Sequence, residues 1–215
     1  MKYLIVAGGT VDEQFAVDII KNGGYEVIIA VDAGMDFCYE SRIMPDVIVG
    51  DFDSVEQEVL EFFQGQEQMD IHRLNPEKDD TDTEYALRFA IGRGATKITV
   101  LGGTGSRLDH VIGNVVLLGV GLEKNVSIEL LDTHNKIKMV NSSLSIRKDE
   151  RFGKYLSVIP ITGKADGVTI TGVKYPLDNY DMHGFNTLGI SNEIVDDEAA
   201  ITVRNGIVLV IESRD

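Results

Sequence analysis

The stretch "KITVLGGTGSRLDHVIGN" at residues 97–114 decides the fold of this chain. It opens with an apolar run that ends at a glycine pair, and apolar residues then recur at helical spacing from residue 107 to residue 125. An apolar run without polar alternation is typical of a strand buried on both faces, as in a parallel sheet. The stretch therefore predicts a crossover unit of strand, glycine turn and helix.

The same alternation of strand and helix patterns fills the first 132 residues. Predicted strands lie at 3–9, 26–32, 46–51, 97–103 and 126–132, and helical patterns lie at 12–24, 34–42, 82–94 and 107–125. Leu108, Ile112, Val115 and Val116 mark the helical spacing of the last pattern. Repeated units of this kind predict an α/β domain with a mainly parallel open sheet, whose ligands bind at the carboxyl ends of the strands.

After residue 132 the helical period disappears. Short runs rich in β-branched residues follow, separated by Gly, Asn and Asp turn signals. In "RNGIVLVIE" at 204–212, the Asn205–Gly206 pair suits a tight turn and predicts a β-hairpin. We therefore expect an α/β domain over residues 1–132 and a small all-β sandwich over residues 133–215.

Composition limits the partners. The chain of 215 residues is 43% hydrophobic and carries a formal charge of −15, from 20 basic and 35 acidic residues. So acidic a protein repels phosphate backbones and anionic lipids, so we expect neither nucleic acid nor membrane as a partner. The apolar run after Met1 is too short for a signal peptide, which favours a cytoplasmic location. The single cysteine, Cys38, is expected to be a buried apolar residue and not a nucleophile.

Two acidic clusters follow predicted strands. Asp51 and Asp53 lie in "DVIVGDFDSV" at 46–55, and Asp79, Asp80 and Asp82 lie in "PEKDDTDTEYAL" at 76–87. Helix capping explains one or two of these aspartates. It does not explain five of them at neighbouring positions, because like charges so close are unfavourable unless protons or cations intervene. The clusters favour a metal–phosphate site, with Mg²⁺ bridging carboxylates and substrate phosphates.

Each cluster coincides with a predicted helix start. Capping-box patterns pair Ser54 with Gln57, Thr81 with Glu84 and, as a weaker version, Ser106 with Asp109. Three helix N-termini, each with free backbone N–H groups, would then meet at one edge of the sheet. His110 lies inside the third helix start, where a site residue and an ordinary polar first-turn residue are equally consistent with the pattern.

Two glycine turns also lie between a strand and a helix, "AGGT" at 7–10 and "LGGTGSR" at 101–107. Glycines there let the backbone approach a phosphate, and Arg107 beside them is a candidate phosphate clamp. Neither stretch is a Walker A or dinucleotide-binding motif, and a tight turn is the better explanation of either pair alone.

Six stretches together resemble the thiamine pyrophosphokinase (thiamin diphosphokinase) family. They are "VDAGMDF" at 31–37, "PDVIVGDFDSV" at 45–55, "KDDTDTEYAL" at 78–87, "LGGTGSRLDHVIGN" at 101–114, "GVKYPL" at 172–177 and "TLGISNE" at 187–193. The resemblance implies a homodimer with two active sites at the subunit interface. It also implies transfer of the β,γ-pyrophosphoryl group of ATP to the hydroxyethyl oxygen of thiamine, with release of AMP.

The resemblance assigns roles to individual residues. It implies that Asp51, Asp53, Asp79 and Asp82 are Mg²⁺ ligands and, with Arg107, catalytic, while Asp80 occupies a variable position. It implies that ATP is bound by Gly8, Gly9, Asp32, Gly102, Gly103, Arg107 and Asn114. It implies that thiamine is bound by Asp109, His110, Ser191, Asn192 and Tyr175, although Tyr175 could equally be a core residue. Ala33 stands where the family element has a glycine, which weakens the expectation of backbone contact there.

Two other functions fit parts of the pattern. Clusters of the form D-x-D also serve Mg²⁺-dependent phosphohydrolases and sugar-nucleotide transferases, and a non-catalytic thiamine or nucleotide sensor could keep the same fold. The preferred nucleotide, the number of metal ions, the general base and the tolerance for thiamine analogues do not follow from the sequence.

Overall fold

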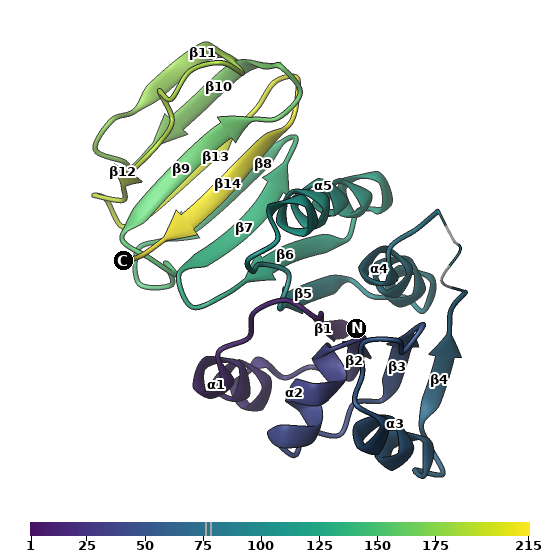
Figure 1. The fold of residues 1–215 in the computed structure, drawn as a ribbon. Helices are drawn as coiled ribbons and strands as arrows, with labels where there is room; N and C mark the ends of the chain where they lie inside the picture. The colour runs from purple at the N-terminus through teal and green to yellow at the C-terminus, as the bar shows by residue number, and fades with distance from the viewer. Residues whose placement is uncertain (76, 78) are drawn as a thin grey trace. The chain divides into compact units, whose positions relative to one another are not determined.

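The computed structural model describes residues 1–75, 77 and 79–215, and it divides into two compact units, Met1–Thr133 and His134–Asp215 (Figure 1). Pro76 and Lys78, which belong to the second acidic cluster of the sequence, lie outside the described residues. The predicted succession of an α/β fold and an all-β fold is confirmed.

The first unit is an open α/β sheet in the order β6-β5-β1-β2-β3-β4, with parallel pairing throughout its described strands (Figure 1). Its strands are β1 Lys2–Val6, β2 Val27–Val31, β3 Val47–Gly50, β4 Asp70–Arg73, β5 Lys97–Leu101 and β6 Ser127–Leu131. Its helices are α1 Glu13–Gly23, α2 Gly34–Glu40, α3 Gln57–Gln64, α4 Asp82–Gly92 and α5 Leu108–Lys124. The chain runs outward from β1 in both directions, so the strand order reverses between β1 and β5.

The predicted strands are continuous apolar runs because helices cover both faces of this sheet. All four residues of β3 are buried, as are the last four of β1, β5 and β6. Successive side chains of a strand point to opposite faces, so such a run requires cover on both. Strand β4 was not predicted from the sequence. It lies at the edge of the sheet, and its four residues alternate between half-buried and exposed, so it has no continuous apolar run.

Of the predicted helix caps, one is confirmed and two are wrong. The Thr81 hydroxyl accepts a hydrogen bond from the Glu84 N–H at 3.2 Å, and α4 begins there as predicted. Ser54 does not cap α3, which begins at Gln57 after Glu56. Ser106 does not cap α5, which begins at Leu108, and among the described residues no side chain makes the cap hydrogen bond there. The two serines belong to longer loops, so the spacing alone misplaced both helix starts.

Helix α5 turns part of its apolar surface outward. Leu108, Ile112 and Val116, which mark its helical spacing in the sequence, are 70%, 62% and 57% exposed. Its buried residues are Leu118, Val120 and Gly121. Apolar residues surround most of this helix, so periodicity identifies the helix without showing which face packs.

The second unit contains the antiparallel run of strands β12-β9-β14-β7 and a separate four-stranded antiparallel sheet in the order β11-β10-β13-β8. Its strands are β7 Asn135–Val140, β8 Ser143–Arg147, β9 Tyr155–Pro160, β10 Lys164–Thr171, β11 Leu177–His183, β12 Asn192–Glu193, β13 Glu198–Thr202 and β14 Val208–Ser213. Leu156 and Val210 from one sheet and Ile170 and Ile201 from the other share one buried core. The unit is therefore the predicted sandwich.

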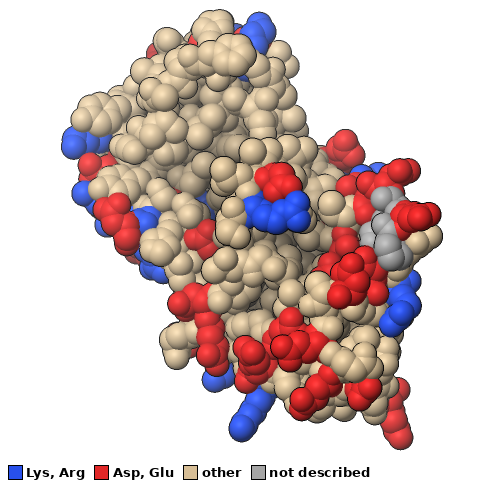
Figure 2. Space-filling view, in the orientation of Figure 1, with Lys and Arg blue, Asp and Glu red and all other residues tan. Residues whose placement is uncertain are grey.

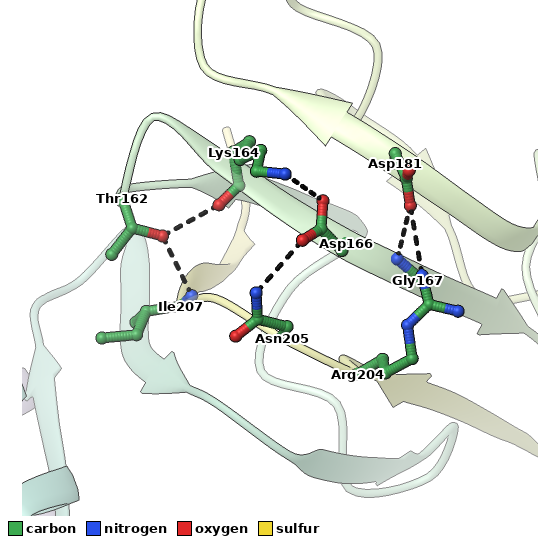
Figure 3. A network of polar contacts seen from close by, with 8 residues as sticks. All are labelled: Thr162, Lys164, Asp166, Gly167, Asp181, Arg204, Asn205 and Ile207. Carbon is green, nitrogen blue, oxygen red and sulfur yellow. Dashed lines mark hydrogen bonds and ion pairs between the residues drawn. The ribbon is translucent and has the colours of Figure 1, made fainter.

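The predicted hairpin at Asn205–Gly206 is wrong, because β13 and β14 belong to different sheets. The connection crosses from one sheet to the other, and a polar network holds it at the end of the sandwich (Figure 3). Asn205 donates to Asp166 at 3.1 Å, and Thr162 accepts from the Ile207 N–H at 3.2 Å. The Asn–Gly pair specified a turn correctly, but the tertiary network decides where the next strand goes.

None of the helices in the described part of the chain has the length and apolarity of a membrane span. Cys38 lies on α2 with no exposed surface, as expected. Burial raises the pKa of its thiol to about 12. At neutral pH the side chain is therefore a protonated apolar group and not a thiolate.

We expect the folded protein to resist thiol reagents. At pH 8 a disulfide reagent should label less than a tenth of Cys38 within an hour, because the reagent needs an accessible thiolate. In denaturant the same protein should react at once with one equivalent, which serves as the internal control. Rapid stoichiometric labelling without denaturant would contradict the burial of this side chain.

Candidate active site

A cavity of about 490 Å³ lies in the first unit where strands β1, β2 and β5 end. Residues 8–10, 31–33, 81–83 and 102–107 line it, together with Ser54 and with His110 and Asn114 of α5. It thus lies beside the reversal of strand order between β1 and β5, where open α/β sheets bind their ligands. Helices α4 and α5 begin at the wall of the cavity, and helix N-termini favour anions.

The two glycine turns pack against each other, backbone to backbone. The Gly9 N–H donates to the Gly102 carbonyl oxygen at 2.9 Å, and the Thr10 N–H donates to the Thr104 carbonyl oxygen at 2.8 Å. A Cβ added at Gly9 would run into both of these carbonyl oxygens. Gly102 has a φ of +66°, and a Cβ there would run into the Ala7 carbonyl oxygen. The glycines are therefore required for the joining of the turns before any ligand is considered.

Side chains from two neighbouring elements hold the longer glycine turn. Asn114 of α5 donates from Nδ2 to the Gly103 carbonyl oxygen at 2.8 Å. The Thr104 hydroxyl donates to Asp132 Oδ2 at 2.9 Å. Asn114 was assigned to ATP, and the structure shows it supporting the turn that lines the cavity. Thr104 and Asp132 were not among the predicted site residues, although Asp132 directly follows an apolar strand, as Asp32 and Asp51 do.

Two of the predicted aspartates reach the cavity. Asp82 is the first residue of α4. Asp32 follows β2 with a φ of +46°, and its N–H donates to the Val49 carbonyl oxygen at 3.0 Å. The carboxylate of Asp32 lies against Gly50, where a Cβ would collide with it. Gly50 thus makes room for the Asp32 carboxylate at the end of β3.

The other predicted metal ligands lie in the loops around the cavity. Asp51 is half-buried directly after β3, and its Oδ1 accepts a hydrogen bond from the Asp53 N–H at 3.0 Å. Asp53, Asp79 and Asp80 are exposed. Within residues 1–75, 77 and 79–215, no group of three or more His, Cys, Asp or Glu side chains is placed to hold a metal ion. The four-carboxylate metal site stays a prediction.

Arg107 and Asp109, assigned to phosphate and to thiamine, bind each other in the structure. The guanidinium donates to the carboxylate through NH2 at 2.6 Å and through Nε at 3.3 Å. The hydrogen bond to Asp109 raises the pKa of Arg107, and the hydrogen bond from Arg107 lowers the pKa of Asp109. Both side chains are exposed, so they can separate at little cost when substrates arrive.

In the second unit, the residues assigned to thiamine share one surface. The amide of Asn192 is buried and is bonded to the backbone of Tyr175, donating at 2.7 Å and accepting at 3.0 Å. Ser191 has a φ of +58°, an uncommon conformation for a residue with a side chain. Tyr175 is 63% exposed, with the Lys174 ammonium 5.6 Å from its ring centroid. Asn192 therefore fixes the loop that presents an exposed aromatic ring.

The fold and the cavity define an α/β protein whose site suits phosphate groups, followed by a β-sandwich. Two family models match the chain: the thiamin pyrophosphokinase catalytic domain over residues 22–130 and the thiamin pyrophosphokinase vitamin B1 binding domain over residues 141–208. The chain belongs to the thiamin pyrophosphokinase family, as the resemblance of its motifs indicated.

Individual relatives agree with this assignment. The thiamine pyrophosphokinase of Bacillus subtilis (strain 168) is 36% identical over 189 residues, which cover 87% of each chain. A crystal structure of thiamine pyrophosphokinase from Bacillus subtilis aligns with a TM-score of 0.89 and 32% identity, over 100% of both chains. A crystal structure of thiamin pyrophosphokinase from Geobacillus thermodenitrificans aligns with a TM-score of 0.86 and 32% identity, over 100% of this chain and 98% of that chain.

Replacing Gly102 with alanine tests the joined glycine turns. The new Cβ meets the Ala7 carbonyl oxygen in a backbone conformation that favours glycine. We therefore expect the free energy of unfolding to fall by about 2 kcal/mol or more and the Tm to fall by about 4–8 °C. Gly92→Ala is the matched control, because a Cβ there meets nothing within 4 Å and the residue ends helix α4. Equal melting temperatures for Gly102→Ala and the parent would show that the turns are not closely packed.

Proposed function

We propose that the chain transfers the pyrophosphoryl group of ATP to thiamine, giving thiamine diphosphate and AMP. The observation that carries the proposal is that both halves of the family match coincide with candidate site residues. The catalytic-domain match contains residues 31–33, 81–83 and 102–107 of the cavity wall, and the vitamin B1 binding match contains Tyr175, Ser191 and Asn192. The chain accordingly has a candidate surface for each substrate.

ATP is assigned to the cavity of the first unit. A volume of about 490 Å³ lies within the range of small-molecule sites. The glycine turns at Gly8–Gly9 and Gly102–Gly103 expose backbone to the cavity, and the start of α5 supplies N–H groups there. Arg107 at the rim is suited to a phosphate, because its planar fork already binds the carboxylate of Asp109. Asp32 and Asn114 complete the proposed ATP site.

A divalent cation, which we take to be Mg²⁺, is assigned to Asp51, Asp53, Asp79 and Asp82. Mg²⁺ is commonly held by one or two carboxylates together with waters and substrate phosphates, so a dense protein cluster is not required. Asp51 fits this use because the Asp53 N–H orients its carboxylate, and a carboxylate with one hydrogen bond retains acceptor capacity. A bound Mg²⁺ would neutralise phosphate charge in a protein of net charge −15.

Thiamine carries a fixed positive charge, which suits an acidic surface. On the face shown in Figure 2, carboxylates gather over the first unit. In the transfer, the hydroxyethyl oxygen of thiamine bonds to the β-phosphorus and its proton is released to solvent. The bond from that phosphorus to the α–β bridging oxygen breaks, and AMP leaves with the bridging oxygen. The chain positions both substrates, and Arg107 stabilises charge that develops on the transferring group. Asp109, His110, Ser191 and Tyr175 are the proposed thiamine contacts.

The protein is proposed to work as a homodimer, with each site shared between two copies. The outward face of α5, formed by Leu108, Ile112 and Val116, adjoins the proposed substrate residues Asp109 and His110. The second unit exposes Leu188, Ile190 and Val195 in the segment that carries Ser191, and it also exposes Tyr175. Exposed apolar side chains that lie close together in the chain in this way are typical of an interface between copies.

Replacing Asp51 with asparagine tests whether Asp51 is a metal ligand or only forms the turn. The amide oxygen can still accept from the Asp53 N–H, but the charge is lost. We expect turnover to AMP and thiamine diphosphate to fall at least about a hundredfold, which corresponds to about 3 kcal/mol. Asp12→Asn is the matched control, because Asp12 caps α1 through the Phe15 N–H and asparagine caps equally well. Near-normal turnover of Asp51→Asn would show that this aspartate only shapes its loop.

The same assay separates the alternatives. AMP formation that requires thiamine supports the transferase. Nucleotide turnover without thiamine would indicate a hydrolase, and binding without turnover would indicate a sensor.

Replacing Ile112 with glutamate tests the shared site. A charge on the outward face of α5 opposes burial against a second copy, so we expect a monomer by light scattering and a thiamine KM at least tenfold higher. Met44→Glu is the matched control, because Met44 is an apolar residue of the first unit that is 50% exposed. A monomeric Ile112→Glu protein with an unchanged thiamine KM would contradict a site shared between copies.

A further inference from the structure

The hydroxyl of Thr104 and the carboxylate of Asp132 form a tether beneath the longer glycine turn. The Thr104 hydroxyl donates to Asp132 Oδ2 at 2.9 Å in a partly buried position. The carbonyl of the same threonine accepts from the Thr10 N–H at 2.8 Å. Thr104 is thus fixed by its side chain to the end of β6 and by its backbone to the other glycine turn.

The turn needs such a tether because of its composition. Three of the five residues from Gly102 to Ser106 are glycines, which lose more conformational freedom on ordering than any other residue. Thr104 lies between Gly103 and Gly105, and its side chain is bonded to Asp132, the residue that directly follows β6. A turn that is ordered before the ligand arrives binds the ligand more tightly, because less conformational entropy is lost on binding.

Asp132 acts through Thr104 and not on the ligand. It follows β6, the strand beside β5, and it is not among the described residues that line the cavity, whereas Thr104 is. A carboxylate is a strong acceptor for a hydroxyl, which favours one orientation of the threonine side chain. We propose that Asp132 is a positioning residue that, through the Thr104 hydroxyl, holds the glycine turn in the shape that receives the phosphates of the nucleotide. This inference rests on the proposed function of the cavity as a nucleotide site.

The same pair of strands supplies a matched control. The Thr99 hydroxyl of β5 donates to Glu129 Oε1 of β6, also at 2.9 Å. This second threonine–carboxylate bond is buried within the sheet, and neither residue is among the described residues of the cavity wall. Thr99→Val therefore removes a threonine–carboxylate bond between β5 and β6 away from the cavity, and Thr104→Val removes the same kind of bond between the loops that follow these two strands, at the cavity.

The experiment measures ligand affinity by calorimetry for the full chain and its variants. The probes are ATP with Mg²⁺ and inorganic tripolyphosphate, with adenosine titrated by NMR. For Thr104→Val and Asp132→Ala we expect affinity for ATP and for tripolyphosphate to fall about tenfold, with adenosine unchanged. Asp132→Asn, which keeps an acceptor oxygen, should recover most of the loss. Thr99→Val should lower the Tm without changing any of the three affinities.

A double-mutant cycle completes the test. Because both residues act through one hydrogen bond, the Thr104→Val/Asp132→Ala protein should bind ATP no more weakly than either single variant. Additive losses, an equal loss in Thr99→Val, or an equal loss for adenosine would overturn the tether. A parent protein that binds ATP but forms no AMP with thiamine would overturn the proposed function and leave the tether measurable, whereas a parent that binds no nucleotide would overturn both.

Discussion

The hydrogen bond from the Gly9 N–H to the Gly102 carbonyl oxygen joins two turns that are more than ninety residues apart in the chain. It can form only because neither position carries a Cβ. The cavity depends on this contact, since residues 8–10 and 102–107 form much of its wall. Asn114 and Asp132 then fix the longer turn from α5 and from β6. The glycines are therefore required first for close backbone packing, and this packing determines the shape of the cavity wall.

Charge at the site is organised by pairing. Arg107 is bonded to Asp109, and Asp51 is bonded to the Asp53 backbone. These three predicted ligand groups, Arg107, Asp109 and Asp51, thus already have partners that orient them. Exchange of these partners for substrate groups costs little at exposed positions, because exposed ion pairs contribute little to stability.

Elements that depend on local periodicity could be predicted from the sequence. Contacts that depend on residues far apart in the chain could not. Continuous apolar runs and helical spacing predicted five of the strands of the first unit, whereas β4 was too short and too polar in pattern. The Asn205–Gly206 turn was recognised, but the sheet that β14 joins depends on the network around Asp166. In the site, the aspartates after β2 and β3 were identifiable because they follow apolar runs. The pairing of Arg107 with Asp109 and the occupation of the Asn192 amide by Tyr175 depend on tertiary packing and were not predictable from spacing.

The position of β1 within its sheet has a consequence for how the chain folds. β1 is synthesised before its partners β2 and β5, and Val6 lies opposite Ala30 on one side and Leu101 on the other. One edge of β1 must therefore wait for a strand that leaves the ribosome about ninety residues later. Contacts of such sequence separation slow folding, because the intervening loop must close first. The two glycine turns meet only when β5 has docked on β1, so the cavity is among the last features of the first unit to form.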